Sequence, residues 1–102
     1  MRKYTVIVMD DVEDYFVDLM RFVASKYTLE TAIRYAKRIR EEVETLSYLA
    51  PILPESKYKQ PKRYYPEAKT YAITKKKLTV IFHIEEDYVI VDKILPSVLI
   101  TR

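Results

Sequence analysis

The stretch LTVIFHIEEDYVIVDKIL, residues 78–95, contains two strand-like runs separated by a short acidic connection. Apolar and β-branched residues dominate both runs, and the connection is short enough for an antiparallel hairpin. Alternate residues of a strand point to the same face of a sheet. One face of this hairpin is therefore expected to pack on the rest of the protein. Its predicted members are Leu78, Val80, Phe82, Ile84, Tyr88, Ile90 and Ile94.

A third run, KTYAIT at residues 69–74, precedes the hairpin and is joined to it by Lys75–Lys77. The three runs predict an antiparallel meander. The sequence contains no glycine, so residues such as Asp87 and the three lysines must form turns that glycine would form at lower cost. A further strand, buried on both faces, is predicted at residues 3–9 from its β-branched and apolar side chains.

Two helices are predicted between the first strand and the meander. The first places apolar side chains of residues 12–23 along one stripe, with Asp10 or Asp11 as its N-cap. The second covers residues 29–49, with Thr28 as its cap, and its polar face of Arg, Lys and Glu is interpreted as solvent or partner surface. The short break between them predicts an antiparallel helix hairpin. The expected fold is therefore α+β, with the hairpin packed on the sheet in one domain over residues 1–102.

Composition excludes several classes of protein. The 102 residues include no cysteine and one histidine, so disulfides are excluded, a metal site is not expected, and no cofactor is predicted. The N-terminal apolar run becomes acidic too soon for a signal peptide, and no apolar run is long enough to cross a membrane. We therefore expect a cytoplasmic protein.

The positive charge is concentrated in one segment. Residues 57–77 carry eight Lys or Arg and one Glu, a net +7, whereas the residues on either side sum to −2 each, giving the net +3 of the chain. Such a local field attracts polyanions through phosphate contacts. The segment could equally be a solvated loop that keeps the protein soluble. Tyrosines among the cations, which could stack on bases, leave both interpretations open.

Three pieces of the sequence, taken in order, resemble the RelE/ParE toxin superfamily. They are YTVIVMDDVEDYFVDLMRFV at 4–23, AIRYAKRIREEVETLSYLAPILPE at 32–55 and KLTVIFHIEEDYVIVDKI at 77–94. The resemblance implies a RelE/ParE-like fold and a toxin of a bacterial type II toxin–antitoxin module. It further implies a cognate antitoxin that wraps partly over the sheet and helices. The expected assembly is a homodimer or a hetero-oligomer with the antitoxin.

The resemblance also implies one of two targets. One branch of the superfamily cuts mRNA on the ribosome, and the other inhibits DNA gyrase without cutting RNA. An mRNA interferase is the function expected first, with a gyrase inhibitor or a catalytically degenerate member as alternatives. Many nuclease members have a Tyr-Arg pair where this chain has Leu78–Thr79, and a His or Tyr motif where it has LPSVLITR. These departures favour the gyrase branch.

Cutting RNA requires a base, an acid and cations that stabilise the charged phosphorane. The candidate catalytic residues are Lys62, Arg63, Lys69 and His83. His83 has a suitable pKa class, but a lone histidine on a sheet face more often packs or hydrogen-bonds. A lysine of lowered pKa and Glu67 are the other candidate bases. Nucleic-acid contacts are predicted for Lys57, Lys59, Tyr64, Tyr65, Lys75, Lys76 and Lys77, with one of the two adjacent tyrosines expected to anchor the loop.

Overall fold

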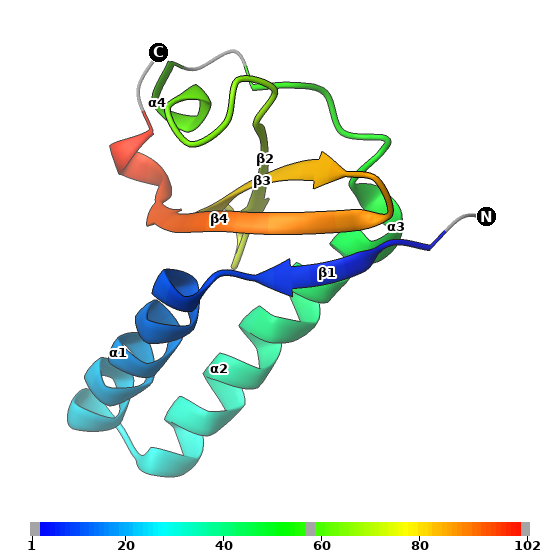
Figure 1. Ribbon diagram of the computed structural model, residues 1–102. Coiled ribbons are helices and arrows are strands. Elements are labelled where there is room, and N and C mark those ends of the chain that lie inside the picture. Colours follow the sequence, from blue (N-terminus) through cyan, green and yellow to red (C-terminus); the bar gives the residue numbers. More distant parts are fainter. Residues whose placement is uncertain (1–2, 57–58, 101–102) are drawn as a thin grey trace.

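The computed structural model describes residues 3–56 and 59–100 and contains a four-stranded mixed sheet with helices on its faces (Figure 1). The strand order is β1-β4-β3-β2, with β1 (Thr5–Val8) at one edge and β2 (Lys69–Ile73) at the other. The predicted meander is confirmed: β2 pairs antiparallel with β3 (Leu78–Glu85), and β3 with β4 (Tyr88–Pro96). The first strand completes the sheet by pairing parallel to β4.

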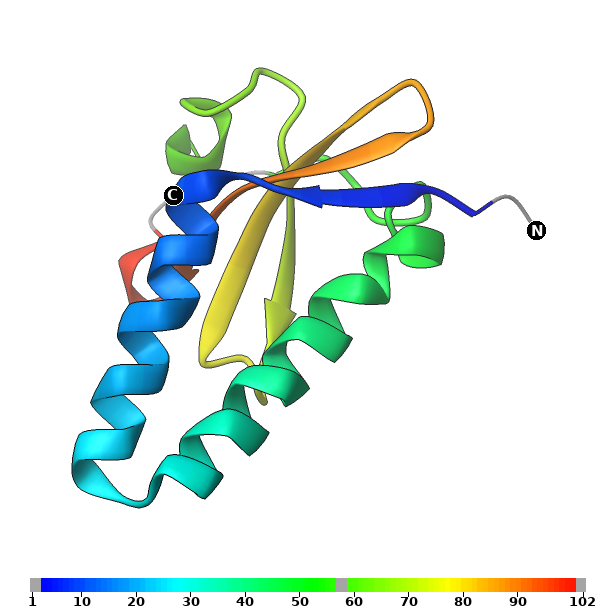
Figure 2. The ribbon, with the colours of Figure 1, turned by 60° about the horizontal axis from the view of Figure 1, so that its bottom comes forward.

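The predicted helix hairpin is also confirmed and covers one face of the sheet (Figure 2). It consists of α1 (Asp10–Lys26) and α2 (Leu29–Glu44), followed by the short helix α3 (Leu46–Leu49). The Thr28 side chain caps α2 by accepting a hydrogen bond from the Thr31 amide at 3.1 Å, as expected. The cap position of α1 is instead Met9, which makes no side-chain cap hydrogen bond. Asp10 and Asp11 lie in the first turn, where their negative charges interact favourably with the helix dipole.

The main core lies between this hairpin and the sheet. Phe16 and Ile39 of the helices are buried against residues of the two central strands. The central-strand members of this core are Leu78, Val80, Phe82, Val89, Val91 and Ile94, with Ile84 packed against them. The predicted face was right for β3 and for Ile94. It was wrong for Tyr88 and Ile90. These two residues pair with Glu85 and His83, and all four lie on the other face of the sheet.

A β-bulge in β4 causes this change of face. Ile81 pairs with Lys93 and Phe82 pairs with Val91, so Asp92 is an extra residue without a partner on β3. An extra residue reverses the alternation of side chains on the bulged strand. Val91 and Ile94 therefore share the core face although they are an odd number of positions apart. Before the bulge, the same reversal places Val89 rather than Tyr88 in the core.

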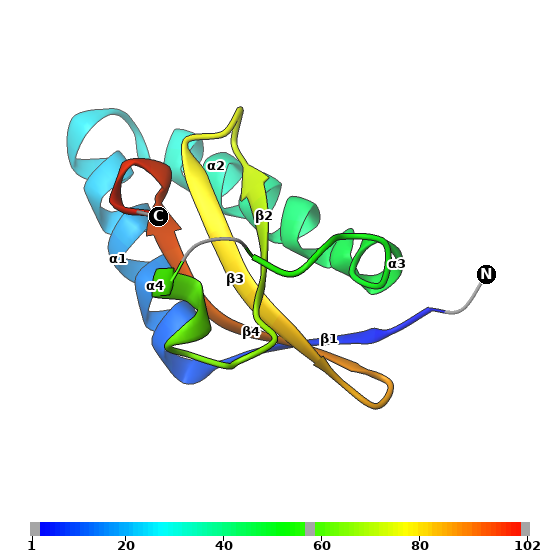
Figure 3. The same cartoon turned by 90° about the horizontal axis from the view of Figure 1, so that it is seen from above.

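Residues 59–68 of the basic segment cover the second face of the sheet, the one opposite the helix hairpin (Figure 3). The segment contains a short helix, α4 (Lys59–Lys62), and its Pro61 and Ala68 are fully buried. Ile81 of β3 points away from the main core and is also fully buried. The expectation of a solvated loop is therefore wrong for these apolar positions, whereas Lys62 and Arg63 do face solvent.

The edge strand β1 is covered on one face only. Val6 and Val8 pack against the core, whereas Thr5 and Ile7 are exposed. The predicted burial of this strand on both faces is wrong, because β1 lies at the sheet edge and lacks a covering element on its outer face. After β4 the chain forms a 3-10 helix, Ser97–Leu99. No helix within the described residues is long and apolar enough to span a membrane.

The turn between β2 and β3 is the most strained part of the backbone. Thr74, Lys75 and Lys76 have φ angles of 50°, 57° and 70°, and Glu86 in the next turn has 53°. Left-handed geometry costs a non-glycine residue about 1–2 kcal/mol. The prediction that lysines would form a tight turn is confirmed for Lys75 and Lys76. In the second turn Glu86, rather than Asp87, adopts the left-handed conformation.

An ion pair joins the two helices of the hairpin. Arg40 donates to both carboxylate oxygens of Glu13, at 3.0 and 2.7 Å, and its guanidinium lies 4.6 Å from the centre of the Phe16 ring. The hydrogen bond from Arg40 lowers the pKa of Glu13 below its usual 4.5. Folding thus favours the ionised carboxylate, and the ion pair adds to the free energy of unfolding. This stabilisation is lost when Glu13 is protonated.

We expect Glu13→Gln to lower the free energy of unfolding at pH 7 by less than about 1 kcal/mol, because the pair is half exposed and screened by solvent. The difference between variant and wild type should shrink as the pH falls below the ordinary glutamate value of 4.5 and through the lower value of the folded protein. Urea unfolding across this pH range measures it. A difference that is constant with pH would show that the ion pair makes no contribution.

Candidate functional site

The sequence's one histidine lies on the face of the sheet opposite the helix hairpin, beside the bulge of β4. His83 Nδ1 is 2.6 Å from Oδ2 of Asp92, and His83 Nε2 is 3.5 Å from Oε1 of Glu85. The bulge brings these groups together, since it turns Asp92 out of the regular alternation. With its proton on Nδ1, the imidazole donates to Asp92, which fixes the orientation of the ring.

Tyr65 covers this histidine. The two rings are stacked, with centroids 3.8 Å apart and an angle of 10° between their planes. The His83 side chain is only 7% exposed as a result, and that of Asp92 only 14%. Tyr65 is thus the member of the tyrosine pair that anchors the basic segment to the sheet, as the sequence predicted of one of them. The Tyr65 ring covers one face of the imidazole, and the little exposed surface of His83 leaves a substrate limited access to it.

Burial controls the protonation of the carboxylate in this cluster. Removal from water raises the pKa of Asp92, and the neighbouring charge of Glu85 raises it further. The hydrogen bond and charge of His83 act in the opposite direction, and burial is the larger effect. A charged Asp92 therefore costs folding free energy at neutral pH. His83 and Asp92 form a largely buried polar pair beside the exposed Glu85, which is the arrangement expected of a structural histidine.

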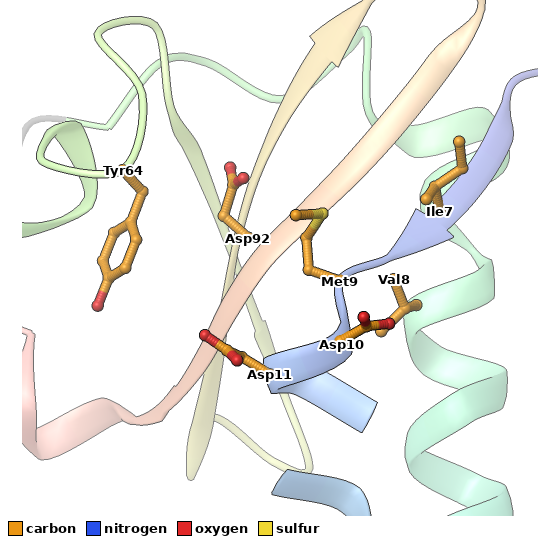
Figure 4. Close-up of a pocket in the computed structure, with 7 residues that line it drawn as sticks. All are labelled: Ile7, Val8, Met9, Asp10, Asp11, Tyr64 and Asp92. Atoms are coloured by element: carbon orange, nitrogen blue, oxygen red, sulfur yellow. The ribbon is translucent and has the colours of Figure 1, made fainter. Parts of the chain in front are cut away.

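A cavity of about 480 Å³ opens beside the cluster, between the end of β1 and the basic segment (Figure 4). Asp10, Asp11 and Asp92 contribute carboxylates to its wall, and Tyr64 contributes a 43% exposed ring. The remaining lining residues are Ile7, Val8 and Met9. Within the described ranges, no group of His, Asp and Glu is arranged to hold a metal ion. The cavity thus presents negative charge, which repels phosphate groups and suits a cationic ligand.

The predicted cations do not converge on this cavity. Lys69 is half-buried and donates from Nζ to the Ala50 carbonyl at 3.0 Å, a contact that ties β2 to the end of the helical region. Lys62 and Arg63 are exposed and form no ion pair with any residue in the described part of the chain. Glu67 is exposed as well. Lys57 lies outside the described residues, as does the side chain of Lys59.

The three lysines of the β2–β3 turn lie at the opposite end of β3 from His83. They precede Leu78, the first residue of the strand, whereas His83 pairs with Ile90 near its other end. The predicted site residues therefore lie in separate places. His83 is buried, Lys62 and Arg63 are exposed, and Lys69 is bonded to the Ala50 carbonyl. The three lysines of the turn lie between β2 and β3.

Sequence reasoning missed the acidic residues of this region. Asp92 was not singled out, and Asp10 and Asp11 were interpreted only as helix-capping residues. One signal could have found Asp92: in the stretch VIVDKIL the apolar residues Val91 and Ile94 are three positions apart, and this breaks the period of two expected for a strand. A polar residue inside such a break is a candidate for a bulge.

Comparison with known proteins identifies similarity to a solved structure. No protein-family model and no curated protein matches the sequence. Among solved structures, the chain is similar to one in the structure described as "Chromosomal ParDE TA system from P. aeruginosa", with a TM-score of 0.78 and 11% sequence identity. The match covers 94% of this chain and 98% of that chain. The chain therefore has the fold of the RelE/ParE toxin superfamily, as the resemblance of its sequence implied.

Proposed function

We propose that this chain is the toxin of a type II toxin–antitoxin module and that it acts on its target by binding, as members of the ParE branch do. The fold supports the toxin assignment. The buried, covered histidine supports the choice of branch, because a nuclease needs a base that its substrate can reach.

The electrostatics of the cavity support the same choice. Cleavage of RNA builds negative charge on phosphate oxygens, and nucleases place cations around that charge. Here the cavity beside His83 is lined by Asp10, Asp11 and Asp92. The exposed carboxylates of Asp10 and Asp11 would oppose both the binding of RNA and the charge of the phosphorane. A binding-only toxin has no such requirement, and inhibition of DNA gyrase is its expected mode.

An mRNA interferase is the second candidate function. The exposed, unpaired side chains of Lys62 and Arg63 favour it, since cations free of ion pairs within the described residues are available for a phosphate backbone. Under this alternative, the double variant Lys62→Ala with Arg63→Ala would lose toxicity. Under the proposed function we expect it to keep toxicity, because that function assigns no role to either side chain.

We assign the antitoxin surface to the far end of the helix hairpin. Large apolar side chains are exposed there although the hairpin otherwise covers the core. They are Val17, Phe22, Tyr27, Leu29 and Ile33, with exposures between 40% and 70%. Ile33 is exposed because the N-terminal end of α2 projects beyond the sheet (Figure 2). Apolar surface of this kind on a small protein is typical of a partner interface.

Two measurements test the proposed function. Induced expression in bacteria should stop growth, and co-expression of the protein encoded by the neighbouring gene should restore it. Purified protein should then inhibit supercoiling by DNA gyrase, and wild type and the Lys62, Arg63 double variant should inhibit equally. Growth arrest with fully active gyrase would reject the gyrase target, and unaffected growth would reject the toxin assignment.

A further inference from the structure

A second cavity, of about 220 Å³, lies on the opposite side of the fold from the carboxylate-lined one. Arg38 and Tyr35 of α2 form one wall, and Thr74, Lys75 and Lys77 of the β2–β3 turn form the other. A neighbouring cavity of about 150 Å³ shares Tyr35 and Arg38 and adds Thr31 and Arg34. The fold thus joins cations from two segments that are far apart in the sequence.

The cations of this cavity outnumber the acidic residues beside it. Within residues 3–56 and 59–100, Arg38, Lys75 and Lys77 form no ion pair. Arg34 is held by Glu30 at 3.0 Å. The carboxylate of Glu42 accepts a hydrogen bond from the Thr74 amide at 3.0 Å, so one negative charge lies beside the cavity and offsets part of its positive charge. No acidic residue lines either cavity.

The conformation of the turn is a second, independent observation. Lys75 is left-handed, with a φ of 57°, and lies between Thr74 and Lys76, which are left-handed as well. Glycine would adopt this geometry without strain. Strained backbone of this kind is concentrated at functional sites. The strain at Lys75 places a cationic side chain in the wall of the cavity.

We propose that this cavity, formed by Arg38, Lys75 and Lys77, binds the phosphate backbone of a nucleic acid. A nucleic acid is favoured over an acidic peptide because its phosphates lie in a regular row. Each Lys or Arg of the two adjacent cavities that contacts a phosphate releases a counterion condensed on the nucleic acid, and this release favours binding. The inference does not depend on the toxin assignment, since a protein that leaves RNA uncut can still bind it or bind DNA.

The first test is the salt dependence of binding. Fluorescence anisotropy with a short labelled single-stranded DNA of mixed sequence gives the dissociation constant at several salt concentrations. Each lost phosphate contact reduces the slope of log affinity against log salt by about 0.7, so Arg38→Gln with Lys77→Gln should reduce it by about 1.4. The matched control, Arg21→Gln with Lys37→Gln, removes the same charge from exposed residues that line neither cavity. Equal slopes in the two double variants would overturn the proposal.

The second test separates binding from folding. Lys75→Gly removes a cation from the cavity and relieves the left-handed strain. We expect it to raise the urea midpoint while weakening DNA binding several-fold, two opposite effects that a misfolded protein cannot produce. Unchanged DNA affinity in this variant would overturn the proposal. Competition by polyglutamate as strong as that by unlabelled DNA would also overturn it in favour of an acidic protein partner. Either result would leave the proposed toxicity untouched.

Discussion

Replacing Ile81 by alanine is expected to lower the free energy of unfolding by about 2–5 kcal/mol. Ile81 is fully buried but lies outside the main core, on the face of the sheet where the segment around α4 lies. Truncation there removes apolar contacts and leaves a cavity on this face of β3. If the basic segment were a solvated loop, the same change would remove little buried surface. Urea unfolding followed by circular dichroism measures the difference.

The matched control is Ile7→Ala, the same change on the edge strand β1. Ile7 is 40% exposed, and we expect its replacement to cost no more than about 1 kcal/mol. A cost for Ile81→Ala as small as that for Ile7→Ala would show that the segment does not cover the sheet in solution. It would also remove the basis for a histidine closed off by Tyr65.

The second large effect is expected at the helix hairpin. Phe22→Asp combined with Ile33→Asp should weaken the antitoxin complex at least about 100-fold, because each change places a charge in an interface of exposed apolar side chains. The two positions are 56% and 53% exposed, so the stability of the free protein should change little. In cells, the neighbouring gene product should no longer restore growth. Copurification of the two proteins gives the direct measurement.

Apolar residues exposed elsewhere provide the control for this variant. Ile52 and Val98 are 70% and 87% exposed and lie outside the hairpin. Ile52→Asp with Val98→Asp introduces the same charges, and we expect it to leave both copurification and rescue intact. Loss of the complex in this control alone would place the antitoxin on the other side of the molecule.

The sequence predicted most of the fold because local signals and long-range packing agree there. The stripe that includes Val12 and Phe16, the cap at Thr28 and the alternation from Leu78 to Ile84 each predicted their element, and the structure has them all. The order of the strands in the sheet was harder to predict from the sequence. Nothing local in residues 5–8 indicates that this strand occupies an edge, since apolar side chains suit both edge and central positions.

The candidate site was harder to predict because it depends on one inserted residue. The bulge at Asp92 reverses the faces of β4, brings a carboxylate to His83 and moves Tyr88 and Ile90 out of the core. Composition suggested that the basic segment would be a binding surface. In the structure, Pro61 of this segment is buried and Tyr65 stacks on His83. Such long-range packing produces no periodic pattern in the sequence of the segment.

The central claim is a toxin that binds its target and leaves RNA uncut. Genome-wide mapping of RNA 5′ ends, before and after controlled expression in bacteria, tests it most directly. We expect growth to stop without new 5′ ends at a fixed position within codons, because His83 is covered by Tyr65 and the adjoining cavity repels phosphate. New ends that cluster at one codon position would contradict this claim. They would establish a ribosome-dependent nuclease whose base becomes accessible only when the segment over His83 opens.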